Sequence, residues 1–343
     1  MINFALKRKV FYIVFGFVII IPLLLYSFTR NQKQNSFSII VCSYNYGQFI
    51  EKTIQSVLQQ THKNFELILV NDGSTDNTLE IMQKYALKDK RIKIINQENQ
   101  GLSMARNNAM NIATGDYLWF VDADDFIIPN ALHLLNRKIN NNDEPDLISF
   151  YVQNFIDDKV ILTYLIKLPD EVWKFRFNKL MGKDLSIYVL KSYPVTSGQH
   201  LYKRNFIKKH NIKFIPKIKF EDDIFFHTSL QANAHIAVLR KAIYMKRAHP
   251  KSIVANRDKY YDSITKLPIH IYEETLRVGK NEEMSRNLFT HYVSMVFDRY
   301  PNDKKFIPDI EALITWLKQQ PENKFWIDNT NKLQKFVNNK IAE

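Results

Sequence analysis

Short apolar runs alternate with helical stretches in the first half of the chain, and this alternation limits the possible folds more than any other feature. The β-rich runs occupy residues 37–43, 65–70, 91–96 and 116–121. The helical stretches lie near residues 47–60, 76–88 and 101–113. Strands that alternate with helices at this spacing are typical of a parallel sheet with helices on both faces. We therefore expect an α/β fold with a mostly parallel sheet.

Polar, turn-forming residues follow three of these strands. The segments are Ser43-Tyr44-Asn45, Asn71-Asp72-Gly73-Ser74 and Asp122-Ala123-Asp124-Asp125. Open parallel sheets bind ligands in the crevice outside the carboxyl ends of their strands. We expect the three segments to line one such crevice.

Two common phosphate-binding motifs are absent from the sequence. Neither Gly-x-Gly-x-x-Gly nor Gly-x-x-x-x-Gly-Lys-Ser/Thr occurs. A bound phosphate would then need another source of positive charge. Asp122 and Asp124, two residues apart in an extended segment, would project to the same side and could share one cation. Hard carboxylate oxygens favour Mg²⁺ or Mn²⁺.

Basic residues outnumber acidic ones, 48 to 35, and give a net charge of +13. This excess favours an anionic partner. No basic-aromatic binding module accompanies the charge, so nucleic acid is not expected. Seven basic residues crowd one stretch, where they form either a solvated face or a site for an anionic acceptor or bilayer. They are Lys203, Arg204, Lys208, Lys209, Lys213, Lys217 and Lys219.

The N-terminal segment has the length of a membrane-spanning helix. Residues 10–28 carry no charge, and as a helix they would measure roughly 28 Å, close to the thickness of the hydrocarbon core. A cleaved signal peptide is the alternative, but no small-x-small cleavage site follows the run. We expect residues 1–36 to form an uncleaved membrane anchor and a linker.

About ninety consecutive residues carry a family resemblance. The strings "SIIVCSYNYGQFIEKTIQSVLQQTHKNFELILVNDGSTDNT" and "NQGLSMARNNAMNIATGDYLWFVDADD" resemble the nucleotide-sugar-binding half of the family 2 glycosyltransferases. That family has the GT-A fold, with a Rossmann-like sheet. The resemblance implies a metal-dependent, inverting enzyme that moves a sugar from a nucleoside diphosphate sugar to an acceptor hydroxyl.

The resemblance assigns four residues to the donor nucleotide. Ser43, Tyr44 and Asn45 match the segment that lines the nucleotide, and Asp72 matches the acid that contacts the base. Packing by Tyr44 and capping of a helix by Asp72 are the structural alternatives.

Three further residues are assigned to the sugar and phosphate side of the donor. Arg106 matches a basic residue near the nucleotide and diphosphate, although it could equally pair with a surface carboxylate. Asp122 matches the acid that approaches the ribose, and Asp124 matches the metal ligand.

The resemblance continues on the acceptor side, in residues 197–226. Leu201-Tyr202-Lys203-Arg204 is present, and Ile215-Pro216 replaces the Phe-Pro of the family. An attacking hydroxyl needs a carboxylate base, and Asp222 matches it. Glu221 and Asp223 flank Asp222, and repulsion among the three acids should raise the pKa of at least one. These acids could also simply complement the dipole of a helix N-terminus.

The expected organisation has four parts. Residues 1–36 are the anchor and linker, 37–150 the nucleotide-sugar-binding part, 151–257 the acceptor side with the base, and 258–343 a helical region. Apolar residues three and four apart predict the last part. Within it, Trp316 and Trp326 are expected in a core rather than at a membrane interface.

The main hypothesis is a glycosyltransferase of surface glycan synthesis, such as lipopolysaccharide or capsule, with a glycan or glycolipid acceptor. A nucleotide-sugar-binding protein without turnover and a nucleotidyltransferase are the alternatives. The charges that flank the anchor decide its orientation only weakly. Because nucleotide sugars are made in the cytoplasm, we expect a bacterial inner-membrane protein with a cytoplasmic catalytic domain.

Overall fold

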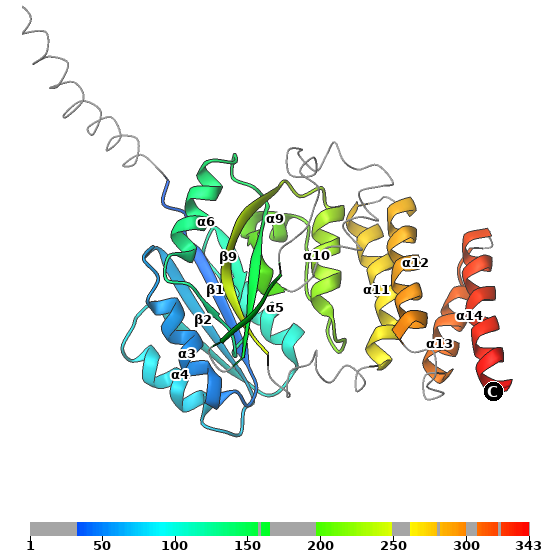
Figure 1. Ribbon diagram of the computed structural model, residues 1–343, viewed down its shortest axis with the longest axis horizontal. Coiled ribbons are helices and arrows are strands. Elements are labelled where there is room, and N and C mark those ends of the chain that lie inside the picture. Colours follow the sequence, from blue (N-terminus) through cyan, green and yellow to red (C-terminus); the bar gives the residue numbers. More distant parts are fainter. Residues whose placement is uncertain are drawn as a thin grey trace, which may run out of the picture.

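The computed structural model describes residues 33–156, 159–164, 197–248, 261–279, 282–299, 307–321 and 324–342. In these residues a nine-stranded sheet is covered by helices, and further helices form a row beside it (Figure 1).

The first part of the chain forms the expected parallel sheet. Its strands are β1 (Phe37–Ser43), β2 (Phe65–Asp72), β3 (Ile92–Gln97) and β4 (Tyr117–Phe120). The helices between them are α3 (Gly47–Leu58), α4 (Thr78–Ala86) and α5 (Leu102–Ile112). Strand β1 pairs in parallel with β2 and β4, and β2 pairs in parallel with β3. The carboxyl ends of all four strands therefore lie at one edge.

The second part adds strands that change the character of the sheet. Its strands are β5 (Phe126–Ile127), β6 (Leu147–Ile156), β7 (Lys159–Tyr164), β8 (His200–Lys203) and β9 (Ile236–Arg247). The sheet order is β3-β2-β1-β4-β8-β6-β9-β5, with β7 beside β6. Strand β8 runs antiparallel to both β4 and β6, and β9 runs parallel to β6.

The expectation of a mostly parallel sheet is therefore wrong, because four strand pairings in the described residues are parallel and four are antiparallel. Parallel neighbours need a crossover connection, usually a helix. The regular alternation of strand and helix ends near residue 146, and the strands added after it are free to enter in either direction.

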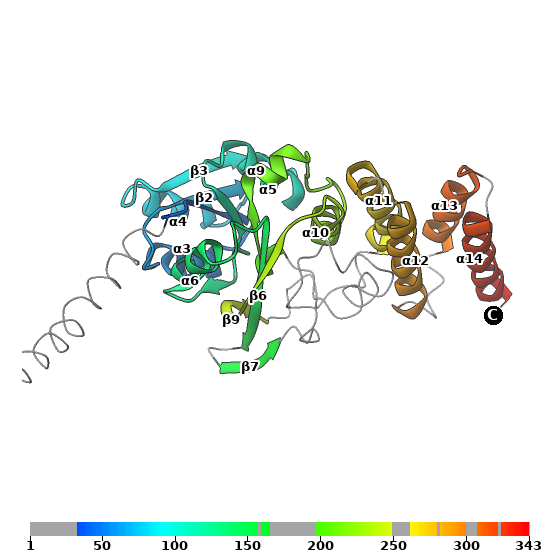
Figure 2. The ribbon, with the colours of Figure 1, turned by 90° about the horizontal axis from the view of Figure 1, so that it is seen from above.

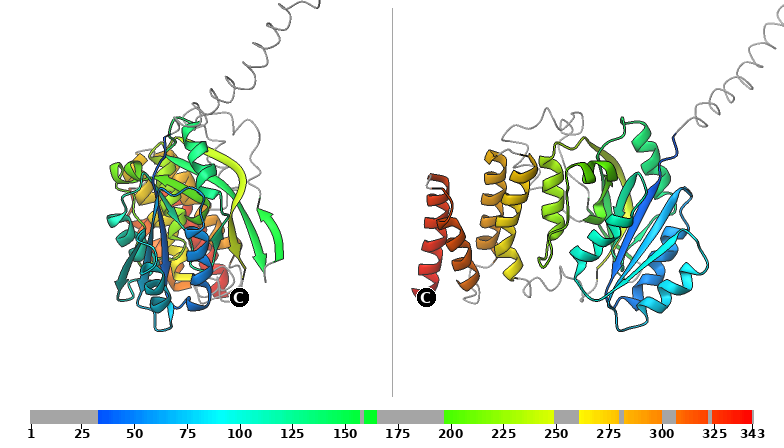
Figure 3. Two further views of the ribbon diagram at one scale, coloured as in Figure 1. Left: turned by 90° about the vertical axis from the view of Figure 1, so that its left-hand side faces the viewer. Right: turned by 180° about the vertical axis from the view of Figure 1, so that it is seen from behind.

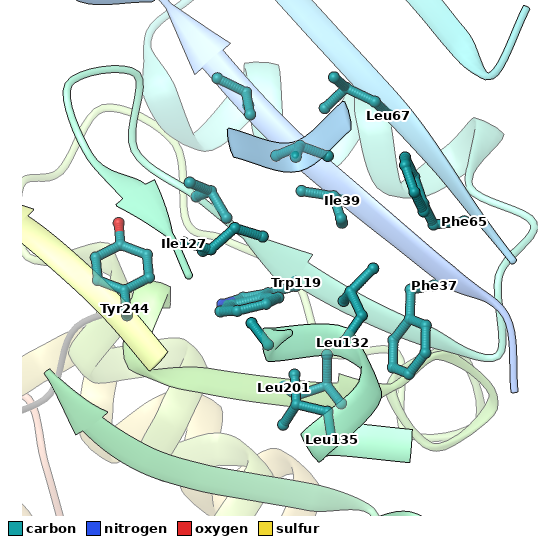
Figure 4. Packing of buried hydrophobic residues seen from close by; sticks show 14 of the residues in the cluster. Phe37, Ile39, Phe65, Leu67, Trp119, Ile127, Leu132, Leu135, Leu201 and Tyr244 are labelled. Carbon is teal, nitrogen blue, oxygen red and sulfur yellow. The ribbon is translucent and has the colours of Figure 1, made fainter. Parts of the chain in front are cut away.

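Side chains that alternate along β1 build a core on each face of the sheet. Ile39 and Val41 lie in the core that α3 and α6 (Ala131–Asn140) cover, and Trp119 occupies its centre (Figure 4). Ile40 faces the opposite core, beneath α5, α9 (Arg204–Lys209) and α10 (Glu221–Gln231). Strands β1, β2 and β4 are almost entirely buried, as expected for a sheet with helices on both faces.

In the described residues after α10, four helices lead away from the sheet (Figures 2 and 3). They are α11 (Tyr261–Gly279), α12 (Glu282–Arg299), α13 (Ile307–Lys318) and α14 (Lys324–Ala342). Trp326 lies 4.9 Å from Tyr272, and Trp316 stacks at 5.8 Å on Phe289, measured between ring centroids. The described residues of this region are mainly helical, as predicted. Trp326 is buried in the core that these helices form, and Trp316 packs against that core.

The predicted membrane placement needs correction. The proposed span, residues 10–28, lies outside the described residues. Among the helices of the described ranges, none combines the length and the apolar character that crossing a bilayer requires. The single-pass anchor in a bacterial inner membrane, with a cytoplasmic catalytic domain, therefore has no structural support and is withdrawn.

Candidate active site

The carboxyl end of β1 presents three of the predicted donor residues. Ser43 is buried, whereas Tyr44 is 46% exposed. Asn45 has a φ of 60°, and its N–H donates to Ser74 Oγ at 3.0 Å. Its Oδ1 accepts the N–H of Thr75 at 2.7 Å. These bonds tie the end of β1 to the turn after β2.

Asp72, at the end of β2, holds the turn that leads into α5. Its carboxylate accepts the N–H groups of Gln100 and Gly101, both at 2.9 Å. It also accepts Nε2 of Gln97 at 2.8 Å. Gly101 has a φ of 85°, which suits glycine. The buried Asp72 carboxylate thus fixes the backbone of residues 100–101, where α5 begins.

Arg106 projects from α5 and joins the two halves of the predicted site. Its Nη2 donates to Asp122 Oδ1 at 3.1 Å, and its Nη1 donates to Glu221 Oε1 at 2.7 Å. Burial disfavours its charge, but the neighbouring carboxylates outweigh burial and raise the pKa of the Arg106 guanidinium. The structure therefore connects the end of β4 to the start of α10.

Helix α10 begins with the three acids Glu221, Asp222 and Asp223. Glu221 is buried, and Asp222 is only half-buried. Burial, together with repulsion from Asp222, raises the pKa of Glu221 to about 7 despite the attraction of Arg106. The prediction that one of these acids has a raised pKa thus falls on Glu221, the acid that faces away from solvent.

The segment after β4, residues 122–125, forms a tight turn that we call the acid turn. The Asp122 side chain is 35% exposed, and Asp125 is buried. The Tyr244 hydroxyl donates to Asp125 Oδ2 at 2.6 Å and accepts the N–H of Asp122 at 3.1 Å. Arg247 donates its N–H to Asp125 Oδ1 at 2.7 Å and its Nε to the carbonyl of Asp124 at 3.1 Å. Strand β9 therefore fixes the turn.

The carboxyl group of Asp125 differs from those of Asp122 and Asp124 in its burial. Burial, with repulsion from Asp124 and Asp122, raises the pKa of Asp125 well above its ordinary value. Its two oxygens are engaged by Tyr244 and Arg247, so it supports the turn from beneath. Asp122 and Asp124, both half-buried, are the acids of the turn nearer to solvent.

A divalent metal fits this turn only with help from a ligand. In the described part of the chain, no three His, Cys, Asp or Glu side chains gather into a metal site. Mg²⁺ is commonly held by one or two carboxylates together with substrate phosphates. The carboxylates of Asp122 and Asp124 fit that requirement.

The structure also shows site residues that the sequence did not indicate. Tyr244 and Arg247 lie more than a hundred residues after the acids they hold, and Glu221 was expected only as a neighbour of the base. The resemblance pointed to the region of Glu221, but no local pattern marks Tyr244 among the other residues of β9.

Comparison with known proteins identifies the class to which this fold and site belong. The model of glycosyl transferase family 2 matches residues 38–210, about half of the chain. The chain belongs to glycosyl transferase family 2.

Individual relatives agree with this assignment. EpsJ of Bacillus subtilis, described as a glycosyltransferase, is 34% identical over 224 residues, which are 63% of this chain and 62% of EpsJ. TarS of S. aureus, solved with UDP-GlcNAc, is similar in structure with a TM-score of 0.64 and 21% identity, covering 89% of this chain and 92% of TarS 1-349. A mannosyltransferase from Pyrobaculum calidifontis, solved with GDP-Man and Mn²⁺, has a TM-score of 0.53 and 14% identity over 89% of this chain and 86% of its own. These structures support the GT-A-like fold.

Proposed function

We propose that the chain transfers a sugar from a nucleoside diphosphate sugar to an acceptor hydroxyl, with inversion, during synthesis of a surface glycan such as lipopolysaccharide or capsule. One observation carries the proposal. Arg106 ties the acid turn after β4 to the acidic first turn of α10, so that the predicted metal ligand and the predicted base belong to one site.

The donor side of the site is assigned to the ends of β1, β2 and β4. Tyr44 offers an exposed aromatic surface for a base, and Ser43 and Asn45 lie beside it. Asp72 contributes by holding the backbone of residues 100–101. Asp122 is the carboxylate nearest the ribose in this proposal.

The acceptor side is assigned to the start of α10. Inverting transfer requires a base that removes the proton of the attacking hydroxyl as its oxygen bonds to the anomeric carbon and the nucleoside diphosphate leaves. Asp222 is half-buried, next to the buried Glu221, and takes this role. The exposed lysines 208, 209, 213 and 217 near α9 suit an anionic acceptor such as a phosphorylated glycolipid or the membrane surface.

Mg²⁺ or Mn²⁺ would be held by Asp124, with the donor phosphates completing its ligands. When bound, the cation would neutralise charge on the leaving diphosphate. The family generally relies on such a cation, and the half-buried carboxylate of Asp124 can supply an oxygen ligand.

A donor screen tests the proposed function. The protein is incubated with UDP- and GDP-sugars, with and without glycolipid acceptors, and released nucleoside diphosphate is measured. Acceptor-dependent release that is lost in Asp222→Asn is the expected result. Donor binding without release would indicate a binding protein, and pyrophosphate released from a nucleoside triphosphate would indicate a nucleotidyltransferase.

A further inference from the structure

Arg106 is enclosed on all sides by the protein. The residue is 3% exposed, and each of its terminal nitrogens is bonded to a carboxylate, Asp122 or Glu221. The guanidinium carbon lies 5.0 Å from the ring centroid of Phe214 and 5.9 Å from that of Phe120. A buried arginine with both terminal nitrogens bonded to carboxylates and an aromatic ring close to its guanidinium has little surface left for a phosphate.

Helix α5, which carries Arg106, is anchored to the segment that precedes α10. Asn107, the next residue on α5, donates Nδ2 to the carbonyl of Phe214 at 2.8 Å and accepts the N–H of Phe214 at 3.0 Å. These bonds clamp α5 to the segment that leads into α10. Arg106 therefore has a fixed position between the acid turn and the first turn of α10.

The start of α10 depends on contacts of this kind. Its N-cap residue is Phe220, in the left-handed region with a φ of 64°, and the Phe220 side chain makes no capping hydrogen bond. A left-handed backbone is costly for a residue with a large side chain. The Arg106 to Glu221 bond holds the first residue of the helix, directly before Asp222.

We infer that Arg106 is a positioning residue, which sets Asp222 relative to the acid turn through Glu221 and Asp122, and not a residue that binds the donor diphosphate. This inference rests on the proposed function, in which Asp222 is the base. It assigns to Arg106 a part in the chemical step and little part in holding the donor.

The test is Arg106→Lys, which keeps the charge but lacks the planar fork that bonds two carboxylates at once. An interaction used only at the chemical step lowers kcat without weakening donor binding. We expect kcat to fall at least about thirtyfold and donor KM to change less than about threefold. A donor KM raised more than about tenfold with kcat retained would show that Arg106 binds the diphosphate, and would overturn the inference.

A matched control is available in Arg91. Its guanidinium pairs with Asp89 and lies 4.1 Å from the Phe65 ring, so it shares the chemistry of Arg106 at a distance from the site. Arg91→Lys should leave kcat and KM unchanged. If both lysine variants lowered kcat equally, the loss would be a general effect of the substitution, and the inference would fail.

A second readout does not depend on turnover. Arg106→Lys should speed amide hydrogen exchange in residues 221–225 at least about fivefold, and the affinity for UDP or GDP by calorimetry should stay within about threefold. Should Arg106→Lys not fold, Glu221→Ala serves in its place: it removes the oxygen that accepts the Arg106 Nη1 bond and should produce the same exchange pattern. Unchanged amide exchange in residues 221–225 of the folded variant would refute the positioning role, even if no sugar transfer were found. An inactive wild type would refute only the proposed function.

Discussion

The buried carboxyl of Glu221 should make the stability of the fold fall as pH rises through neutrality. Its pKa moves from an ordinary value of 4.5 to about 7, because burial and Asp222 together outweigh Arg106. Below pH 4.5 both the folded and the unfolded chains hold the proton. Between pH 4.5 and 7 the unfolded chain loses it first, so the free energy of unfolding decreases with pH. At about 1.4 kcal/mol per pH unit, the total loss is about 3 kcal/mol.

Glu221→Gln removes the ionisation and keeps nearly the same shape. The variant should lack this pH-dependent loss. The difference between its free energy of unfolding and that of the wild type should therefore change in favour of the variant by about 3 kcal/mol from pH 4.5 to 7.5. The measurement is urea unfolding followed by tryptophan fluorescence at half-unit pH steps. Glu311→Gln, an exposed position on α13, is the control and should follow the wild type.

If the wild type and Glu221→Gln lost stability in parallel between pH 4.5 and 7.5, burial would not be raising the pKa of Glu221. If the variant became the less stable of the two at pH 8, the attraction of Arg106 would exceed the cost of burying the charge, and the sign of the shift would be reversed.

Three further changes test the site. Chelation by EDTA, or Asp124→Asn, should lower turnover at least about a hundredfold, and full activity in excess chelator would contradict the metal role. Asp222→Asn should lower kcat about a hundredfold or more with donor KM nearly constant, whereas an inactive Asp223→Asn beside an active Asp222→Asn would move the base by one residue. Tyr244→Phe removes the hydroxyl that bonds the acid turn twice and should destabilise the fold by about 1 to 3 kcal/mol in thermal unfolding; Tyr202→Phe, at a buried tyrosine of β8, is its comparison.

The first half of the sheet was predictable because its signals are local. The expected strands at 37–43 and 116–121 differ from β1 and β4 by at most one residue at either end, since each apolar run is bounded by turn residues. Strand β8 is only four residues long and pairs with β4, more than eighty residues earlier. A pairing that depends on such distant residues leaves no mark in a short sequence window.

For the candidate site, the sequence indicated the residues but not the contacts between them. The resemblance placed Asp122, Asp124 and Asp222 on the elements that the structure brings together. It did not reveal that Arg106 bonds one carboxylate 16 residues away and another 115 residues away. The sequence shows which residues are charged, but whether a charge faces solvent, a ligand or a buried partner depends on tertiary packing.

Because of the place of β8 in the sheet, the first part of the protein cannot be separated from the second without exposing a strand. Strand β8 lies between β4 and β6, so residues 200–203 complete a sheet begun more than 150 residues earlier. A fragment that stopped at residue 150 would leave the apolar strand β4, Tyr117–Phe120, as an open edge without its neighbour. Open apolar edges pair with other chains. Such a fragment should be recovered as aggregates, and a surface loop nicked by protease should leave two pieces that stay together until denatured.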